Sequence, residues 1–280
     1  MIGGMRLAFV KMHGLGNDFI LFDAAPAAPL PRAAQLRDLA DRHTGIGFDQ
    51  ALVLEPPRHA GSAISYRVFN ADGSEVEQCG NGARCVAALV SARLGGGAGT
   101  LLMDSAEGVI EARTRADGLV SVAMGVPDFA PHSLPFEANA AAPSYALAVG
   151  AGTVEIGAVA IGNPHAVLLV ERVADAPVDS LGPLIENHPR FPRRTNVEFM
   201  EIVAPDHIRL RVHERGVGET RACGTGACAA VAVGRRRELL AAEVQVDLPG
   251  GRVSVAWRGE GERIWLTGPT ATVFEGHIEL

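Results

Sequence analysis

The chain has 280 residues, of which 48% are hydrophobic and 20% charged, and its net charge is −7. This composition is typical of a globular protein with a large core, and the acidic balance argues against a nucleic-acid-binding surface. No apolar run approaches the ~18 residues of a membrane-spanning helix, and the N-terminus lacks the apolar core of a secretory signal. We therefore expect a cytoplasmic protein with reduced cysteines, no membrane partner and no nucleic-acid partner.

Cofactor chemistry is narrowed by what the sequence lacks. Lys11 is the only lysine, so pyridoxal phosphate would have a single candidate for its Schiff base. The spacings Cys79 to Cys85 and Cys223 to Cys228 do not match common zinc patterns. No P-loop and no dinucleotide-binding glycine fingerprint is present. The sequence predicts an activity that needs no cofactor and no metal.

In chain order, the first half is predicted to contain short strands and two helices. A helix over 31–43 is indicated by apolar residues at helical spacing. A second helix over 79–94 has almost no polar face, which indicates that it is buried. The strands of this half are predicted at 7–10, 20–22, 51–54, 65–69, 101–103, 109–113 and 119–124. Residues 127–143, rich in Pro and Ala, are the predicted linker.

The second half repeats this order. A mostly apolar helix is predicted over 223–240. Its strands are predicted at 167–170, 196–203, 207–213, 244–248, 253–257, 264–266 and 271–274. We expect an α+β fold with two pseudo-symmetric domains, each a mostly antiparallel β-sheet or barrel wrapped around a buried central helix. The predicted domains are 1–126, joined by the last strand at about 270–280, and 127–269.

One motif occurs twice, at an offset of 144 residues set by Cys79 and Cys223. At this offset Gly80, Gly82 and Ala83 match Gly224, Gly226 and Ala227. In both copies the cysteine stands where a strand-like run gives way to an apolar helix. Backbone N–H groups and the helix dipole at such a place stabilise a thiolate or a bound anion.

Two equivalent cysteines suit one reaction in particular. Related units usually meet across a pseudo-two-fold axis, so Cys79 and Cys223 would point into a shared cleft from opposite sides. A thiolate on one side removes a proton, and a thiol on the other delivers one, which inverts a stereocentre. The N–H groups of Gly80, Asn81, Gly224 and Thr225 would stabilise the charge that builds on an adjacent carboxylate, and His165 and Glu214 would set the protonation balance of the thiols.

Other interpretations stay open at this point. A cysteine near a helix start is, taken alone, more often a packed small residue. Two facing thiols also suit a redox or peroxide-sensing protein, whose working state would be a disulfide. A binding module without catalysis could use the same scaffold. Cys85 and Cys228 lie inside apolar helices, and we interpret them as core residues.

Several motifs in order resemble those of the diaminopimelate epimerases. They are Met12-His13-Gly14-Leu15-Gly16-Asn17-Asp18-Phe19, Gly45-Ile46-Gly47-Phe48-Asp49-Gln50, Asn70-Ala71-Asp72-Gly73-Ser74, Cys79-Gly80-Asn81-Gly82, Gly162-Asn163-Pro164-His165, Glu214-Arg215-Gly216 and Cys223-Gly224-Thr225-Gly226. The resemblance runs from about residue 5 to the C-terminus. A single C-G-x-G would be a weak signal, whereas this ordered set is highly specific.

The resemblance implies interconversion of L,L- and meso-diaminopimelate in lysine and peptidoglycan precursor synthesis, by a cytoplasmic homodimer without pyridoxal phosphate or metal. It implies that Cys79 and Cys223 are the acid/base pair. The substrate site would be lined by Asn17, Gln50, Asn70, Asn163, Asn196, Glu214 and Arg215. Arg215 could hold the distal carboxylate in a bidentate pair, and Glu214 could accept from the distal ammonium.

The nearest alternative is a proline or hydroxyproline racemase, which shares the fold and the two cysteines. A substrate of that size has no distal carboxylate or ammonium. Glu214, Arg215 and the set of asparagines therefore favour diaminopimelate.

Overall fold

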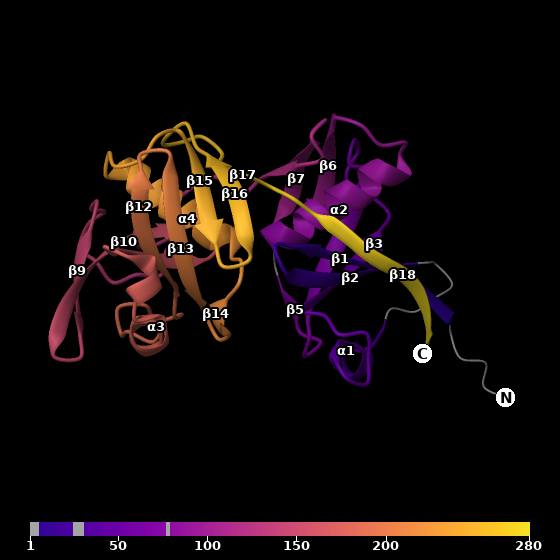
Figure 1. Ribbon diagram of the computed structural model, residues 1–280, viewed down its shortest axis with the longest axis horizontal. Helices are drawn as coiled ribbons and strands as arrows, with labels where there is room; N and C mark the ends of the chain where they lie inside the picture. Colours follow the sequence, from indigo (N-terminus) through magenta and orange to yellow (C-terminus); the bar gives the residue numbers. More distant parts are fainter. Residues whose placement is uncertain (1–5, 25–30, 77–78) are drawn as a thin grey trace. The chain divides into compact units, whose positions relative to one another are not determined.

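The computed structural model describes residues 6–24, 31–76 and 79–280. Contacts divide the chain into two compact units, Met1–Val122 with Gly268–Leu280, and Ala123–Thr267 (Figure 1). Each unit is a mostly antiparallel sheet with one long buried helix. The α+β prediction is confirmed.

The sheet of the first unit is antiparallel except for two pairs. The pairs β2–β3 and β4–β6 are parallel. The strands are β1 (Arg6–Gly14), β2 (Asn17–Asp23), β3 (Gln50–Glu55), β4 (Ile64–Asn70), β5 (Glu75–Val76), β6 (Gly99–Ser105), β7 (Gly108–Thr114), β8 (Val120–Ala123) and β18 (Ala271–Glu279). β18 comes from the C-terminal end of the chain and pairs antiparallel with β1 (yellow beside indigo in Figure 1).

The second unit repeats this pairing scheme. Its parallel pairs are β11–β12 and β13–β15. The strands are β9 (Tyr145–Val149), β10 (Gly152–Ala160), β11 (Pro164–Leu169), β12 (Asn196–Ala204), β13 (His207–Glu214), β14 (Gly218–Thr220), β15 (Glu243–Leu248), β16 (Gly251–Ala256) and β17 (Trp265–Gly268). β9 pairs with β10 as β18 pairs with β1, so both units have an outer strand at the same edge.

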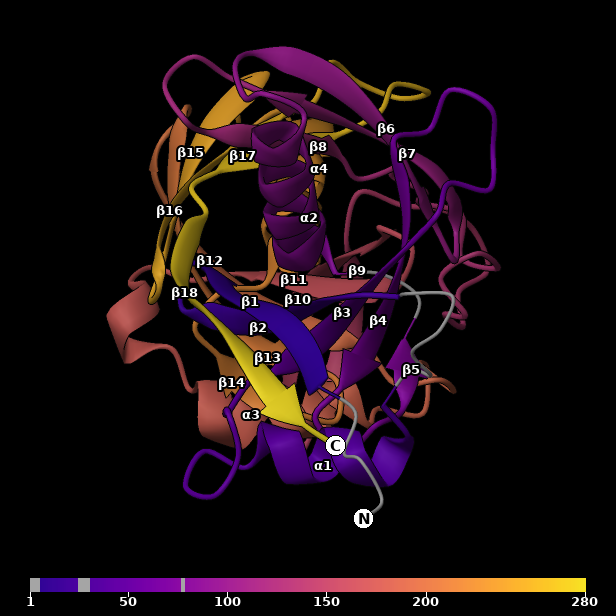
Figure 2. The same cartoon turned by 90° about the vertical axis from the view of Figure 1, so that its right-hand side faces the viewer.

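Two small-residue helices occupy equivalent places in the two units. They are α2 (Gly80–Arg93) and α4 (Gly224–Arg236). α2 lies against β1, β2, β4, β6 and β7 (Figure 2). Glycine, alanine, valine and cysteine make up most of both helices, and the residues that face the sheet are completely buried. A helix that is apolar on nearly every side must be enclosed, which fixes where its N-terminus can lie.

Shorter helices flank the sheets: α1 (Ala33–Ala40), the 3₁₀ turn η1 (Val173–Asp175) and α3 (Val178–Glu186). α3 was not predicted, because Pro177 precedes it and Pro183 lies within it. Residues 127–143, the predicted linker, contain no helix or strand apart from an isolated bridge between Asp128 and Ala160. However, Phe129, Leu134 and Phe136 are buried, so this stretch packs into the second unit.

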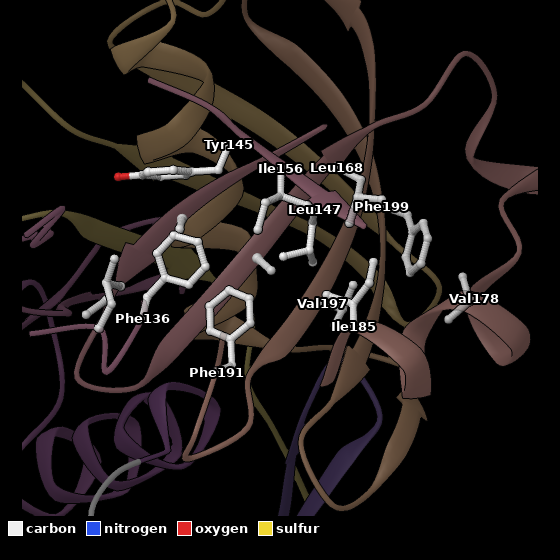
Figure 3. Close-up of a cluster of buried hydrophobic side chains, with 14 of the residues drawn as sticks. Phe136, Tyr145, Leu147, Ile156, Leu168, Val178, Ile185, Phe191, Val197 and Phe199 are labelled. Atoms are coloured by element: carbon white, nitrogen blue, oxygen red, sulfur yellow. The ribbon is translucent and has the colours of Figure 1, made fainter. Parts of the chain in front are cut away.

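A cluster of aromatic and aliphatic side chains forms part of the core of the second unit (Figure 3). The rings of Phe136 and Phe191 stack with centroids 4.6 Å apart. Val197 and Phe199 of β12 also face this cluster. Since side chains alternate along a strand, Glu198 points to the opposite face of β12, toward α4.

We predict that Phe199→Ala lowers the free energy of unfolding by about 3–5 kcal/mol, since the ring is completely buried and leaves a cavity. Leu184→Ala on α3 is the matched control, because Leu184 is 54% exposed. We expect Leu184→Ala to lower the free energy of unfolding by less than about 1 kcal/mol. Urea unfolding measures both, and equal losses would contradict the assigned packing.

Candidate active site

In the first unit, Cys79 is the N-cap residue of α2. Its backbone is extended, with φ −140° and ψ 112°, and the helix begins at Gly80. Asn81 follows, and Gly80 and Asn81 are both buried. The first N–H groups of a helix have no partner within it, so this turn can bind an anion.

The side chain of Asn17 joins this helix start to the β1–β2 turn. The Cys79 thiol donates to Asn17 Oδ1 at 3.7 Å, and Asn81 Nδ2 donates to the same oxygen at 3.1 Å. Asn17 Nδ2 donates to Asp49 Oδ2 at 3.0 Å. The Asp49 carboxylate therefore fixes the amide so that its oxygen faces the thiol.

Charged groups hold this turn in place. Asp18 forms ion pairs with Lys11, at 2.5 Å, and with Arg42, at 2.8 Å. Arg42 also pairs with Asp49 at 2.8 Å. Burial alone would raise the pKa of Asp18, but Arg42 and Lys11 outweigh it and hold that pKa well below its usual range. Lys11, the single lysine, is thus engaged in a structural ion pair.

Gln50 and Asn70 lie opposite each other on β3 and β4. Gln50 Nε2 donates to Asn70 Oδ1 at 3.0 Å, and Asn70 Nδ2 donates to Ser74 Oγ at 3.2 Å. Both residues are only partly buried. The pair therefore offers polar atoms at the end of the sheet where β3 begins.

In the second unit, Cys223 is the N-cap residue of α4 and is 4% exposed. Its Sγ accepts from the N–H of Gly226 at 3.4 Å and lies 3.5 Å from Thr225 Oγ1. Burial, followed by the negative charge of Glu214, raises the pKa of the Cys223 thiol well above its ordinary value. Gly224 is the first residue of the helix, equivalent to Gly80.

Glu214 and Arg215 lie where β13 turns into β14. Thr220 Oγ1 donates to Glu214 Oε1 at 2.5 Å. The N–H of Arg215 donates to Asn196 Oδ1 at 2.9 Å, while Asn196 Nδ2 donates to the carbonyl of Pro164 at 3.0 Å. Asn196 therefore supports the turn that presents Arg215.

A buried carboxylate that the sequence analysis missed anchors the same turn. Glu186, at the end of α3, accepts from the N–H of Gly216 at 2.8 Å and from Arg194 at 3.1 Å. Its other oxygen lies 2.8 Å from His213 Nε2. No sequence signal pointed to it, because Glu186 belongs to the helix that was not predicted.

His165 is completely buried on β11 and contacts two polar partners. Nδ1 lies 2.6 Å from Glu198 Oε1, and Nε2 lies 2.7 Å from Asn163 Oδ1. Asn163 and His165 were predicted site residues, and the structure places them together. Glu198 was not a predicted site residue, because it lies among apolar residues in a stretch that predicts a core strand.

Each unit thus gathers its own predicted residues around one helix start. The first holds Cys79, Gly80 and Asn81 beside Asn17, with Gln50 and Asn70 as a separate pair. The second holds Cys223, Gly224 and Thr225, with two linked pairs, Asn163–His165 and Asn196–Arg215. Within the described residues, no three His, Cys, Asp or Glu side chains are grouped to hold a metal ion, and no helix could span a membrane.

A family model and full-length relatives identify the same family. The family model for diaminopimelate epimerase matches residues 9–130 and 157–273. Diaminopimelate epimerases from Alkalilimnicola ehrlichii and Pseudomonas aeruginosa (strain LESB58) are each 50% identical, over 278 and 276 residues, covering 99% of this chain and 100% of theirs.

Solved structures show the same fold at low identity. A hydroxyproline epimerase from Agrobacterium vitis superposes with a TM-score of 0.72 at 16% identity, covering 98% of this chain and 93% of that one. A PhzF-family phenazine biosynthesis protein from Bacillus anthracis gives 0.67 at 15% identity, covering 99% and 100%. Such identities show the fold alone, whereas the family match and the full-length relatives go further. This chain belongs to the diaminopimelate epimerase family.

Proposed function

We propose that this protein interconverts L,L- and meso-diaminopimelate by moving a proton between its two cysteines and the α-carbon. The observation that carries the proposal is the cysteine at the N-cap of each buried helix, in a chain 50% identical throughout to relatives named diaminopimelate epimerase. In this proposal Cys79 and Cys223 approach the α-carbon from opposite sides. Each acts as base for one stereoisomer and as acid for the other.

The main chemical difficulty is the weak acidity of a proton next to a carboxylate. In our proposal the N–H groups of Gly80, Asn81, Gly224 and Thr225 stabilise the negative charge that builds on that carboxylate. Two helix N-termini add their dipoles to the same effect. This arrangement would replace the electron sink that pyridoxal phosphate supplies in other racemases.

The protonation states of the two cysteines must differ. Cys79 donates to Asn17 Oδ1, whereas Cys223 accepts from the N–H of Gly226. Burial and the negative charge of Glu214 raise the pKa of the Cys223 thiol, so the two thiols lie in different surroundings. His165 and Glu214 are proposed to tune this balance.

The distal end of the substrate is the basis for specificity. We propose that Arg215 pairs with the distal carboxylate and Glu214 accepts from the distal ammonium, while Asn17, Gln50, Asn70, Asn163 and Asn196 shape the rest of the site. The turn at 214–217 is held by Glu186 and Asn196, so Arg215 is presented by a rigid support. A proline-sized substrate would not use these groups.

The function is tested by incubating the reduced protein with L,L-diaminopimelate, with L-proline and trans-4-hydroxy-L-proline in parallel, and separating stereoisomers by chiral chromatography. We expect the meso isomer to form without added cofactor and no change in the two prolines. Inversion of a proline substrate alone would move the assignment to the racemases of the same fold. Turnover that requires the oxidised protein would favour the redox alternative.

We predict that Cys79→Ser and Cys223→Ser each lower kcat by about 10²–10⁴-fold, since each removes one acid/base group. Cys85→Ala and Cys228→Ala are matched controls, because both cysteines are completely buried inside α2 and α4. The controls should keep near-normal kcat and lose only thermal stability. Normal turnover by either serine variant would remove that cysteine from the mechanism.

We also propose a cytoplasmic homodimer, as the family resemblance implies. Val273 and Phe274 of β18 are 54% and 46% exposed, which provides apolar surface for a second copy. Light scattering of the purified protein and cell fractionation check these points. A monomeric mass or a secreted protein would contradict them.

A further inference from the structure

Gly82 and Gly226 are equivalent in the two units, but the side chains of the sheet that pack against them differ in polarity. In the first, a Cβ on Gly82 would lie 3.2 Å from the Leu52 side chain and 3.4 Å from the ring of Phe19. In the second, a Cβ on Gly226 would lie 3.0 Å from Glu198 Oε1. Both glycines are the third residue of α2 or α4, so both allow a side chain of the sheet to approach the helix start.

Strand register shows that these side chains are equivalent. In the parallel pair β2–β3, Phe19 lies opposite Gln50, which is two residues before Leu52. His165 pairs in the same way with Asn196, two residues before Glu198, in β11–β12. The apolar pair Phe19 and Leu52 of one unit is therefore replaced by His165 and Glu198 in the other.

The His165–Glu198 pair is fully enclosed. Both side chains are 0% exposed, with Nδ1 and Oε1 2.6 Å apart. Glu198 Oε2 is buried and has no hydrogen-bond partner within the described residues. An apolar pair would fill this place at lower cost, as it does in the first unit, so stability does not explain the carboxylate.

His165 of this pair also contacts Asn163, a predicted substrate-binding residue. With Nδ1 bonded to Glu198, His165 presents its Nε2–H to Asn163 Oδ1 at 2.7 Å. An amide whose oxygen is held in this way directs its NH2 group elsewhere, as a donor. Asn17, two residues before Phe19, is instead oriented by Asp49, so the two halves fix their asparagines by different means.

We propose that Glu198 is a positioning residue of the reaction: it orients His165, which holds the Asn163 amide with its donor group toward the substrate. This inference rests on the proposed function. It also makes the Cys223 half chemically distinct from the Cys79 half, since the titratable pair His165 and Glu198 lies there in the place that Phe19 and Leu52 occupy in the first unit.

The charged and titratable groups around Glu198 come from three elements. They are His165 on β11, Glu214 at the end of β13 and Cys223 at the start of α4. Burial raises the pKa of Glu198, and His165 opposes that shift. The contact between Nδ1 and Oε1, at 2.6 Å, fixes the orientation of the ring.

The experiment compares Glu198→Leu, Glu198→Gln and the double variant His165→Phe/Glu198→Leu, which copies the apolar pair of the first unit. Glu155→Gln is the control, because Glu155 is 57% exposed and far along the sheet from this pair. Kinetics with L,L-diaminopimelate give kcat and KM for each. Proton NMR follows the far-downfield ring N–H of His165, which the double variant identifies by its loss.

We expect kcat/KM to fall about 10²-fold in Glu198→Leu, the scale of loss that misplacing a substrate-positioning group can cause. Glu198→Gln should lose less than about 10-fold, because its amide NH2 can donate to Nδ1, which leaves the proton of the neutral ring on Nε2 for Asn163 Oδ1. The double variant should fold with a melting temperature near that of the wild type and yet stay as inactive as Glu198→Leu. The downfield signal should vanish in Glu198→Leu and persist in Glu155→Gln.

Near-normal activity of the double variant would overturn the proposal, because it would mean that the pair only fills space. A downfield signal that survives in Glu198→Leu would also overturn it. If the wild type itself does not interconvert diaminopimelate, the proposed function fails, and the NMR comparison still decides whether Glu198 orients His165.

Discussion

The start of each buried helix, with its first N–H groups, is the constraint on which this structure depends. α2 and α4 are apolar on almost every side, so each must be wrapped by its own sheet. Their first N–H groups cannot be paired within the helix. Placing a cysteine at each N-cap puts a thiol beside this electropositive turn, where the same N–H groups can serve a substrate carboxylate.

Repetition of one unit explains the scaffold, and the differences between the copies explain the chemistry. A reaction that inverts a stereocentre needs two groups in opposite protonation states. The copies keep the helix and its cysteine, and the surroundings of the two thiols differ. Asn17 and the ion pairs around Asp18 surround one thiol, whereas Glu214, Glu198 and His165 surround the other.

The sequence predicted the features that follow from local pattern. The cysteines and glycines at 79–82 and 223–226 predicted two buried helix starts, and the alternating strands predicted the sheet. Glu198 was missed because the carboxylate lies in an apolar strand and its partner, His165, is distant in the sequence. α3 was missed because prolines argue against a helix, whereas in the structure it packs on β12, β13 and β14.

The measurement that tests the central claim most directly is the reaction in D2O, stopped after a small fraction of L,L-diaminopimelate has been converted. Two separate bases remove the proton on one side and deliver a solvent-derived deuteron on the other. We predict that the meso product carries deuterium at the inverted carbon, while the unreacted substrate keeps its original proton. Early product that retains the substrate proton, or substrate that exchanges as fast as product forms, would show a single base and contradict the account.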